Sequence, residues 1–313
     1  MSFATLGISG QEILTESRGV YGENLPYEYN RLIEEGHKYY DRVILINPRE
    51  VTYAFRRGET STVVVHDGED ISHLSTLLVR STRDIEQSAA MLARALAVNG
   101  CDIVDTVARF SGGETGKMFS SLRRIKHGTG TTSFFAFSYR QAVAFANTAE
   151  YPLILKPVNG RRGEGVYVLR SPEDAMVHIN AYFPTDHSSF EKPLFFQEFM
   201  DFVVEYRAFI IDGQCIGLAR KTAQAGSFTP NAAQGGTFEA AFDPEAAAFV
   251  EMHVRKNSIL GVDVARTADG DLHIIESNQS PQWQAFEQAT GINVAEQIIR
   301  YAVDRLNVPA MSI

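Results

Sequence analysis

The chain of 313 residues is longer than one typical domain, so we expect two or three domains or lobes. Its net charge of −9 argues against a general affinity for nucleic acid, and no apolar run is long enough to span a bilayer. Cys101 and Cys215 lie far apart in the chain and outside any metal-ligand spacing, and the N-terminus lacks a signal-peptide pattern. We therefore expect a cytoplasmic protein with reduced cysteines, no membrane contact and no nucleic-acid partner.

Short apolar strands alternate with helical stretches over residues 1–112. The predicted elements are strands at 41–48, 62–66 and 75–80 and a helix from Ile85 to Asn99. This alternation predicts a small α/β domain with a mainly parallel sheet. Arg80 ends its predicted strand, a frequent position for a ligand contact in such a sheet, and a plain surface arginine is the alternative.

A Gly-rich break near residue 112 marks a domain boundary, and a basic helix then begins at Lys117 and ends at Gly128. Further on, a buried strand carries Lys156 near its end and runs into the loop Asn159–Gly165. Such a Gly-rich turn can fold its N–H groups around a phosphate, and the lysine would add positive charge. A plain hairpin with basic side chains is the alternative. No Gly-Lys-Ser/Thr sequence ends the loop, so it is not a Walker P-loop.

The next strands bring more charge into apolar surroundings. Gln197 and Glu198 form a polar pair inside a hydrophobic strand. The stretch 205–221 is predicted to be a hairpin that turns at Asp212-Gly213, a strong turn pair. Arg207, Arg220 and Lys221 place cations at its outer ends. Successive strand residues point to opposite faces, so only one of Arg220 and Lys221 can face any one site.

A second predicted hairpin, from Leu260 to Asn278, carries three oxygen-bearing side chains. Glu276 and Asn278 are two residues apart and so share one face of their strand, and simple pairing places Asp263 across from them. Magnesium prefers such a set of protein oxygens, with its other positions left to water and phosphates. A polar strand end beside a surface turn remains the alternative. An Ala-rich helix from Pro244 to Ser258 precedes the hairpin, and a closing helix is predicted from about Ile292 to Leu306.

Taken in chain order, these parts resemble the ATP-grasp superfamily and, within it, the RimK-like carboxylate–amine ligases (alpha-L-glutamate ligase-like). The resemblance covers nearly the whole chain. The matching motifs are Lys117 with its helix, Lys156 with Gly160–Gly165, Phe196–Met200, Glu205–Arg207, Asn231–Gly236, and the hairpin that ends at Asn278. The resemblance implies an α/β chain with the α+β lobes of an ATP-grasp fold after a Rossmann-like domain. We expect the N-terminal domain at 1–112, a central lobe at 113–190 and a C-terminal lobe at 191–313.

The resemblance also implies a role for each matching residue. ATP would be bound by Lys117, Lys156, Gly160, Arg161, Arg162, Gly163, Glu164, Gly165, Gln197, Glu198, Phe199, Met200 and Glu205. Asp263, Glu276 and Asn278 would hold Mg²⁺, with two ions expected and Mn²⁺ as a possible substitute. Arg207 and Lys221, or Arg220 if the register slips, would stabilise the transferring phosphoryl group. The substrates would contact Asn231, Gln234, Gly235, Gly236 and Arg80.

Three positions depart from the family pattern. Gln234 stands where an arginine is usual, and Lys221 stands where an ungapped comparison expects arginine. Lysine supplies charge but not a planar two-pronged fork. Gln282-Trp283 follows Pro281 where a glycine would be typical, which implies a bulkier acceptor side. These departures concern the identity of the substrates and leave the ATP chemistry intact.

The activity implied by the resemblance is ATP-dependent amide formation. ATP would activate a carboxylate as an acyl phosphate, and an amine from an amino acid, a peptide or a protein terminus would attack it. Two alternatives remain open: an ATP-grasp enzyme with a non-amine acceptor or kinase activity, and a nucleotide-binding regulatory protein with degenerate catalysis. Homo-oligomers are common in the family, so one is possible here.

Overall fold

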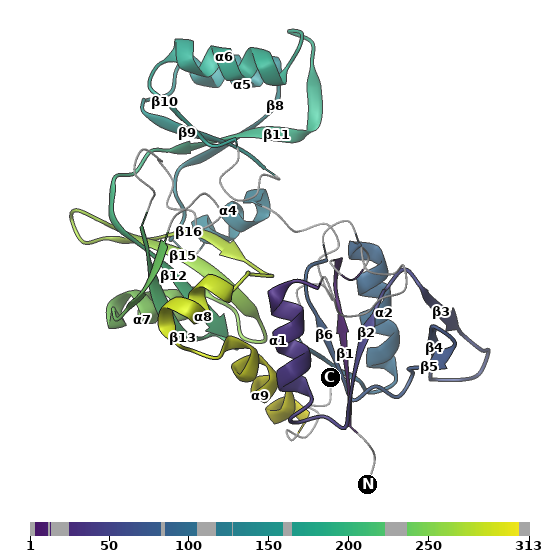
Figure 1. Ribbon diagram of the computed structural model, residues 1–313. Coiled ribbons are helices and arrows are strands. Elements are labelled where there is room, and N and C mark those ends of the chain that lie inside the picture. Colours follow the sequence, from purple (N-terminus) through teal and green to yellow (C-terminus); the bar gives the residue numbers. More distant parts are fainter. Residues whose placement is uncertain are drawn as a thin grey trace.

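The computed structural model describes residues 4–11, 13, 25–82, 85–104, 117–126, 128–158, 165–222 and 237–306. Figure 1 shows an N-terminal domain beside two lobes of sheet and helix, with helix α4 (Lys117–Lys126) between the lobes. This mixed order of helices and strands confirms the α/β class expected from the sequence. No helix within the described ranges is long and apolar enough to cross a membrane.

The N-terminal domain is built on a parallel sheet with strand order β2-β1-β6-β7, which confirms the prediction of a mainly parallel sheet. Its elements are β1 (Thr5–Ser9), α1 (Tyr27–Gly36), β2 (Arg42–Ile46), β6 (Thr76–Val79), α2 (Glu86–Val98) and β7 (Asp102–Val104). Side chains alternate along β6, so Leu78 packs in the cluster that contains Leu32 of α1 while Leu77 packs in the cluster that contains Leu92 of α2. The sheet is therefore covered on both faces.

The strand predicted at 62–66 forms, but outside the parallel sheet. It is β4 (Val63–His66), which pairs in antiparallel fashion with β3 (Val51–Ala54) and β5 (Glu69–Asp70). Asp67 and Gly68 make the tight turn between β4 and β5 with φ angles of 51° and 77°. A turn this short can join only antiparallel neighbours, which explains why β4 does not enter the parallel sheet.

The upper lobe in Figure 1 contains a sheet with strand order β10-β9-β11-β8. Its elements are β8 (Ser133–Ser138), α5 (Tyr139–Ala146), β9 (Leu153–Pro157), β10 (Tyr167–Leu169), α6 (Pro172–Tyr182) and β11 (Ser189–Glu198). Helix α6 begins after Ser171, because the Ser171 hydroxyl accepts a hydrogen bond from the backbone N–H of Asp174 and Pro172 occupies the first turn. The boundary proposed at residues 190 and 191 falls within β11, which pairs with β8 and β9 of this sheet.

The lower lobe is an antiparallel sheet with strand order β14-β13-β12-β15-β16. Its elements are β12 (Phe202–Ile211), β13 (Gln214–Thr222), β14 (Thr237–Ala241), α7 (Pro244–His253), β15 (Ile259–Thr267), β16 (Leu272–Asn278), α8 (Gln284–Thr290) and α9 (Val294–Leu306). The predicted turn at Asp212-Gly213 is confirmed, and both residues have positive φ angles of 53° and 81°. Helix α7 ends five residues before the predicted Ser258, since Asn257 has a positive φ of 57° and Ser258 donates a side-chain hydrogen bond to the carbonyl of Arg255.

A buried glutamate joins the N-terminal domain to the lower lobe. Glu287 of α8 accepts hydrogen bonds from the backbone N–H groups of Val294 at 2.7 Å and Ala295 at 3.3 Å, which opens helix α9. Its other oxygen accepts a hydrogen bond from the Tyr27 hydroxyl at 2.6 Å, across the interface with α1. The Glu287 carboxylate therefore caps the N-terminus of α9, where its negative charge interacts favourably with the helix dipole. Its bond to Tyr27 also holds α1 in place.

Replacing Glu287 by alanine is expected to lower the free energy of unfolding by about 2–4 kcal/mol, because two buried backbone N–H groups and the partly buried Tyr27 hydroxyl lose their acceptor. Chemical denaturation followed by circular dichroism would measure the loss. Glu34→Ala is the matched control, since Glu34 is an exposed partner of Arg31 on α1 and should change stability by less than about 1 kcal/mol. Equal losses in the two variants would contradict the capping role.

Candidate functional site

The two C-terminal strands bring the three predicted oxygen ligands together. Asp263 of β15 pairs directly with Glu276 of β16, and Gly261 pairs with Asn278. A β-bulge just beyond Asp263 changes the pairing, so Val264 faces Ile274. The bulge inserts one residue into β16 and thereby aligns Asp263 with Glu276. Asp263 therefore lies across from Glu276 as expected, but the bulge puts it there and not the simple pairing that the sequence predicted.

Asp263 lies at the centre of a buried charge cluster. Its Oδ1 accepts a hydrogen bond from Arg207 Nε at 2.6 Å, and its Oδ2 accepts from Arg207 Nη2 at 3.2 Å and from Lys221 Nζ at 3.1 Å. Only 5% of Asp263 is exposed. Burial alone would raise the pKa of Asp263, but the charges and hydrogen bonds of Arg207 and Lys221 hold it below its usual range. Asp263 is therefore ionised and forms ion pairs with both Arg207 and Lys221.

Glu205 completes this cluster, and the strand register decides which cation joins it. Lys221 pairs with Glu205 across β12 and β13 and makes an ion pair with it, whereas Arg220 pairs with Tyr206 on the opposite face and is exposed. The structure therefore brings Lys221 to Asp263 and leaves Arg220 away from it. Burial raises the pKa of Glu205 toward neutrality, and the charge of Lys221 opposes that rise.

Glu276 and Asn278 differ from Asp263 because their side-chain oxygens are not occupied by other described residues. Within the described ranges neither side chain has a hydrogen-bond or ion-pair partner, although both are partly buried. A carboxylate and a carboxamide held on one strand face are the hard oxygen donors that Mg²⁺ takes, and Asp263 lies beside them in register. This donor set fits a magnesium ion, and the fit rests mainly on the free oxygens of Glu276 and Asn278.

Lys156 belongs to the upper lobe and lies close enough to Glu276 for the two charges to interact. It lies on β9 opposite Phe195, with its Nζ 4.9 Å from the centre of that ring, and it donates a 2.5 Å hydrogen bond to Gln197 Oε1. The amide nitrogen of Gln197 donates in turn to the Thr131 hydroxyl. Burial, reinforced by the charge of Lys117, lowers the pKa of Lys156 to about 8. Gln197 therefore orients the Lys156 ammonium through this hydrogen bond.

The other predicted ATP-binding residues near Gln197 are Glu198, Phe199 and Met200, and they make fewer contacts with charged groups. Glu198 accepts a 2.8 Å hydrogen bond from the backbone N–H of Thr132, which fastens the end of β11 to the start of β8. Phe199 lines a cavity of about 320 Å³ together with Tyr151, Pro152, Val168 and Arg170. Met200 follows it and is partly buried. The cavity lies at the far end of β9 from Lys156.

Helix α4 (Lys117–Lys126) carries two cations near Glu276, which are Lys117 and Arg124. Arg124 was not among the site residues predicted from the sequence. Burial lowers the pKa of Lys117, and the negative charge of Glu276 opposes the shift. Burial also lowers the pKa of Arg124, Glu276 opposes that shift, and the buried Nε of Arg124 has no hydrogen-bond partner within the described part of the chain. The spacing of seven residues between Lys117 and Arg124, two helical turns, is the signal that could have found it.

Arg80 is buried, so the alternative of a surface arginine is wrong. Only 4% of it is exposed, its guanidinium carbon lies 5.0 Å from the centre of the Trp283 ring, and Nη2 donates to the Pro281 carbonyl at 3.4 Å. Trp283 itself is fully buried and packs edge-on against Phe209. Its ring therefore belongs to the core and does not form the bulkier acceptor side expected from the sequence.

Several predicted site residues lie outside the described ranges. They are Gly160, Arg161, Arg162, Gly163 and Glu164 of the phosphate loop and Asn231, Gln234, Gly235 and Gly236 of the substrate loop. Gly165 is described, and its φ of 70° lies in the left-handed region that glycine favours.

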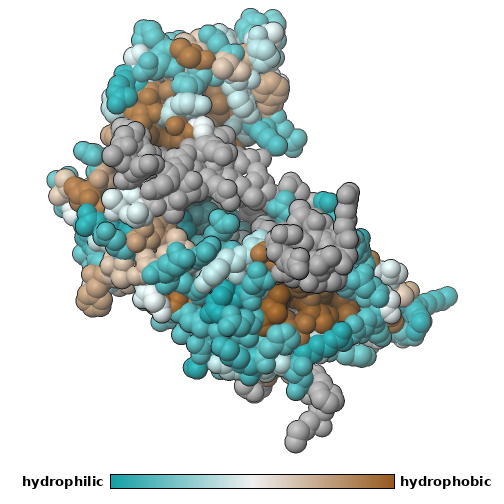
Figure 2. All heavy atoms as spheres, viewed as in Figure 1, coloured by the Kyte–Doolittle hydropathy of each residue, from teal (hydrophilic) through white to brown (hydrophobic). Residues whose placement is uncertain are grey.

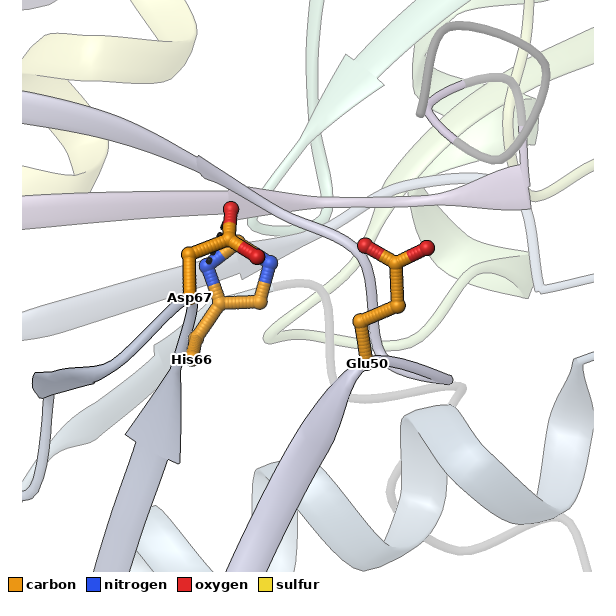
Figure 3. A group of neighbouring side chains, drawn as sticks. All are labelled: Glu50, His66 and Asp67. Atoms are coloured by element: carbon orange, nitrogen blue, oxygen red, sulfur yellow. Dashed lines mark ion pairs between the residues drawn. The ribbon is translucent and has the colours of Figure 1, made fainter. Parts of the chain in front are cut away.

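A separate group of possible metal ligands lies in the N-terminal domain, where Figure 3 shows Glu50, His66 and Asp67 with their ligand atoms facing one another. His66 Nε2 accepts a hydrogen bond from the backbone N–H of Asn47 at 3.2 Å, so the neutral ring carries its proton on Nδ1, which lies 3.8 Å from Asp67 Oδ2. A metal at Nδ1 would have to displace that proton. The ring is therefore arranged for hydrogen bonding.

A cavity of about 480 Å³ adjoins His66 and Asp67 between α1, β2 and the turn from β4 to β5. Apolar side chains such as Ile33, Leu45 and Ile71 line much of it. Figure 2 shows hydrophobic atoms at the surface of this domain on a face that is otherwise mostly hydrophilic. The residues of the charge cluster around Asp263 do not line this cavity.

Comparison with known proteins shows the family to which the chain is related. Residues 117–302 match the family described as the RimK-like ATP-grasp domain. A protein of Aeromonas salmonicida named "Probable alpha-L-glutamate ligase" is 32% identical over 167 residues, which are 51% of this chain and 54% of that protein. A protein of the same name from Legionella pneumophila is 25% identical over 281 residues, 88% of this chain and 91% of its own. The chain thus spans about half the length of the first of these relatives.

A solved structure also has this fold. The ATP-grasp ligase PsnB, in complex with minimal precursor, Mg and ADP, matches with a TM-score of 0.68 over 98% of this chain and 99% of its own. Sequence identity is 15%, so the match concerns the fold alone.

Proposed function

Because this chain belongs to the RimK-like ATP-grasp family, we propose that it is an ATP-dependent ligase that joins a carboxylate to an amine through an acyl phosphate. The observation that carries the proposal is the cluster in which Asp263, Glu276 and Asn278 share a sheet face with Arg207 and Lys221. Phosphoryl transfer asks a protein mainly for positioning and charge neutralisation, and this cluster offers both.

In this proposal Glu276 and Asn278 hold Mg²⁺ beside Asp263. A magnesium ion held by these residues would supply positive charge against the phosphates of ATP. We propose two ions, with Mn²⁺ able to substitute. Lys117 and Lys156 would bind the nucleotide phosphates from α4 and β9, and the loop at 160–165 would exclude water from the reactive acyl phosphate.

Arg207 and Lys221 have a different part in the proposal. Both are fixed by Asp263, so their unused N–H groups keep a set direction. Such preorganised donors would stabilise charge on the transferring phosphoryl group and on the oxyanion formed when the amine attacks. Glu205 would help to orient Lys221 through their ion pair.

The substrates proposed are a carboxylate and an amine on an amino acid, a peptide or a protein terminus. The relatives' names refer to glutamate, and the matching structures of PsnB contain precursor peptides, so both small and peptide acceptors should be tested. Arg80, Asn231, Gln234, Gly235 and Gly236 would contact these substrates. We propose a cytoplasmic setting, a possible homo-oligomer and no nucleic-acid partner.

Trapping with hydroxylamine tests the proposal without knowledge of the amine. The purified protein would be incubated with Mg·ATP, hydroxylamine and a panel of amino acids and peptides, and both the hydroxamate and the nucleotide product would be measured. An acyl phosphate yields ADP and one hydroxamate for each carboxylate activated. Formation of AMP in place of ADP would contradict the acyl-phosphate route.

Nucleotide binding is expected to weaken as the pH rises through about 8. Lys156 binds phosphate only when protonated, and its lowered pKa of about 8 means that the charged fraction falls over this range. The dissociation constant of ADP, measured between about pH 6.5 and 9.5, should rise above pH 8. Lys156→Met should bind ADP weakly and lack this step. An unchanged pH step in that variant would assign the titration to another group.

A further inference from the structure

Arg124 lies in the same region of the fold as the proposed nucleotide site. It follows Lys117 on α4 by seven residues, so the two cations share one face of the helix. Figure 1 shows α4 between the upper and lower lobes, next to β16, which carries Glu276. The charge of Glu276 acts on both Lys117 and Arg124, so this face of α4 lies toward β16.

The guanidinium of Arg124 lacks the partners that a buried charge normally has. Its Nε is inaccessible to solvent and has no hydrogen-bond partner among the residues that the structure describes, and Nη2 donates a 3.3 Å hydrogen bond to the Ser121 hydroxyl. No carboxylate within the described parts of the chain lies in ion-pair distance of it. A buried charge without a partner is costly, so an anion from outside the protein would relieve it.

The charges around Arg124 also favour the binding of an anion. Lys117, Arg124 and Lys156 all lie close enough to Glu276 for its negative charge to raise their pKa values, and Lys117 and Arg124 in turn lower the pKa of Lys156. Positive charge is therefore in excess where α4, β9 and β16 meet. An anion with several oxygens could accept hydrogen bonds from all three cations and leave Glu276 for a metal ion.

We propose that Arg124 is a third phosphate-binding cation, which donates its unpaired Nε–H to an oxygen of the nucleotide's polyphosphate. The inference rests on the proposed nucleotide site and adds a contact to it. Arginine suits this position because its planar donors meet two oxygens at once, which a lysine cannot reproduce. The contact is made only when nucleotide is bound.

Binding of ADP and of adenosine, measured by calorimetric titration without acyl substrate, tests this inference. Arg124→Ala should weaken ADP binding by about 10- to 100-fold, as expected for the loss of a hydrogen bond to a charged group, and should leave adenosine binding unchanged. Arg124→Lys should keep the fold and lie between wild type and alanine. Arg123→Ala is the matched control, since Arg123 on the same helix donates a similar 3.3 Å bond to Ser120 and should bind ADP normally.

Two results would overturn the inference. One is ADP affinity equal to wild type in Arg124→Ala and Arg124→Lys. The other is an equal loss of ADP and adenosine affinity, which would mean that Arg124 only supports the fold. Because no ligation is measured, absence of hydroxamate from the wild-type protein would refute the proposed ligase activity and leave the result for Arg124 unaffected.

Discussion

Replacing Glu276 by glutamine is expected to reduce turnover by about 10²- to 10³-fold while the free energy of unfolding stays near that of wild type. A metal ligand contributes several kcal/mol of charge stabilisation in the transition state, and each 1.36 kcal/mol is about tenfold in rate. The fold should tolerate the change because Glu276 has no ion pair among the described residues. ADP release at saturating ATP and thermal unfolding would measure the two effects.

Ser277→Ala is the matched control for Glu276→Gln. Ser277 is the next residue of β16, pairs with Val262 and points to the opposite sheet face. The Ser277→Ala variant should therefore keep the turnover and the free energy of unfolding of the wild type. Near-normal turnover of Glu276→Gln at limiting Mg²⁺ would remove Glu276 from the metal site.

Replacing Asp263 by asparagine is expected to abolish turnover as well and, in addition, to lower the free energy of unfolding by about 3–5 kcal/mol. The loss of stability is expected because Asp263 neutralises both Arg207 and Lys221. An amide would present an N–H₂ group or a neutral oxygen to two buried cations. Urea denaturation of the variant beside wild type would measure the loss.

An exposed ion pair provides the control for Asp263→Asn. Glu69 and Arg42 also make two hydrogen bonds, but both side chains are about half exposed. Glu69→Gln should therefore cost less than about 1 kcal/mol. Stability of Asp263→Asn within this range would contradict the buried cluster as a source of stability.

The sequence predicts the hairpins and their turns well, because turn pairs and alternating apolar residues are local signals. It could not decide between Arg220 and Lys221, because a β-bulge between Phe209 and Ile210 shifts the register of β12 and β13. Counting from the Asp212-Gly213 turn without that bulge would place Arg220 opposite Glu205. The bulge shifts the pairing by one residue and exchanges the two cations between faces.

Contacts between distant segments were also hidden from sequence reasoning. Arg80 and Pro281 are 201 residues apart, and their hydrogen bond joins the parallel sheet to the segment after β16. Gln197 and Thr131, which orient Lys156, are 66 residues apart. No local pattern records such contacts, so the burial of Arg80 and the role of Gln197 emerge only when the lobes are assembled.

Transfer of ¹⁸O from the carboxylate substrate to phosphate tests the central claim most directly. A carboxylate found by hydroxylamine trapping would be labelled with ¹⁸O and incubated with the protein, Mg·ATP and an amine. The acyl-phosphate route predicts ADP, one amide and one phosphate that contains a single ¹⁸O from the carboxylate. Unlabelled phosphate, or label in AMP, would contradict it.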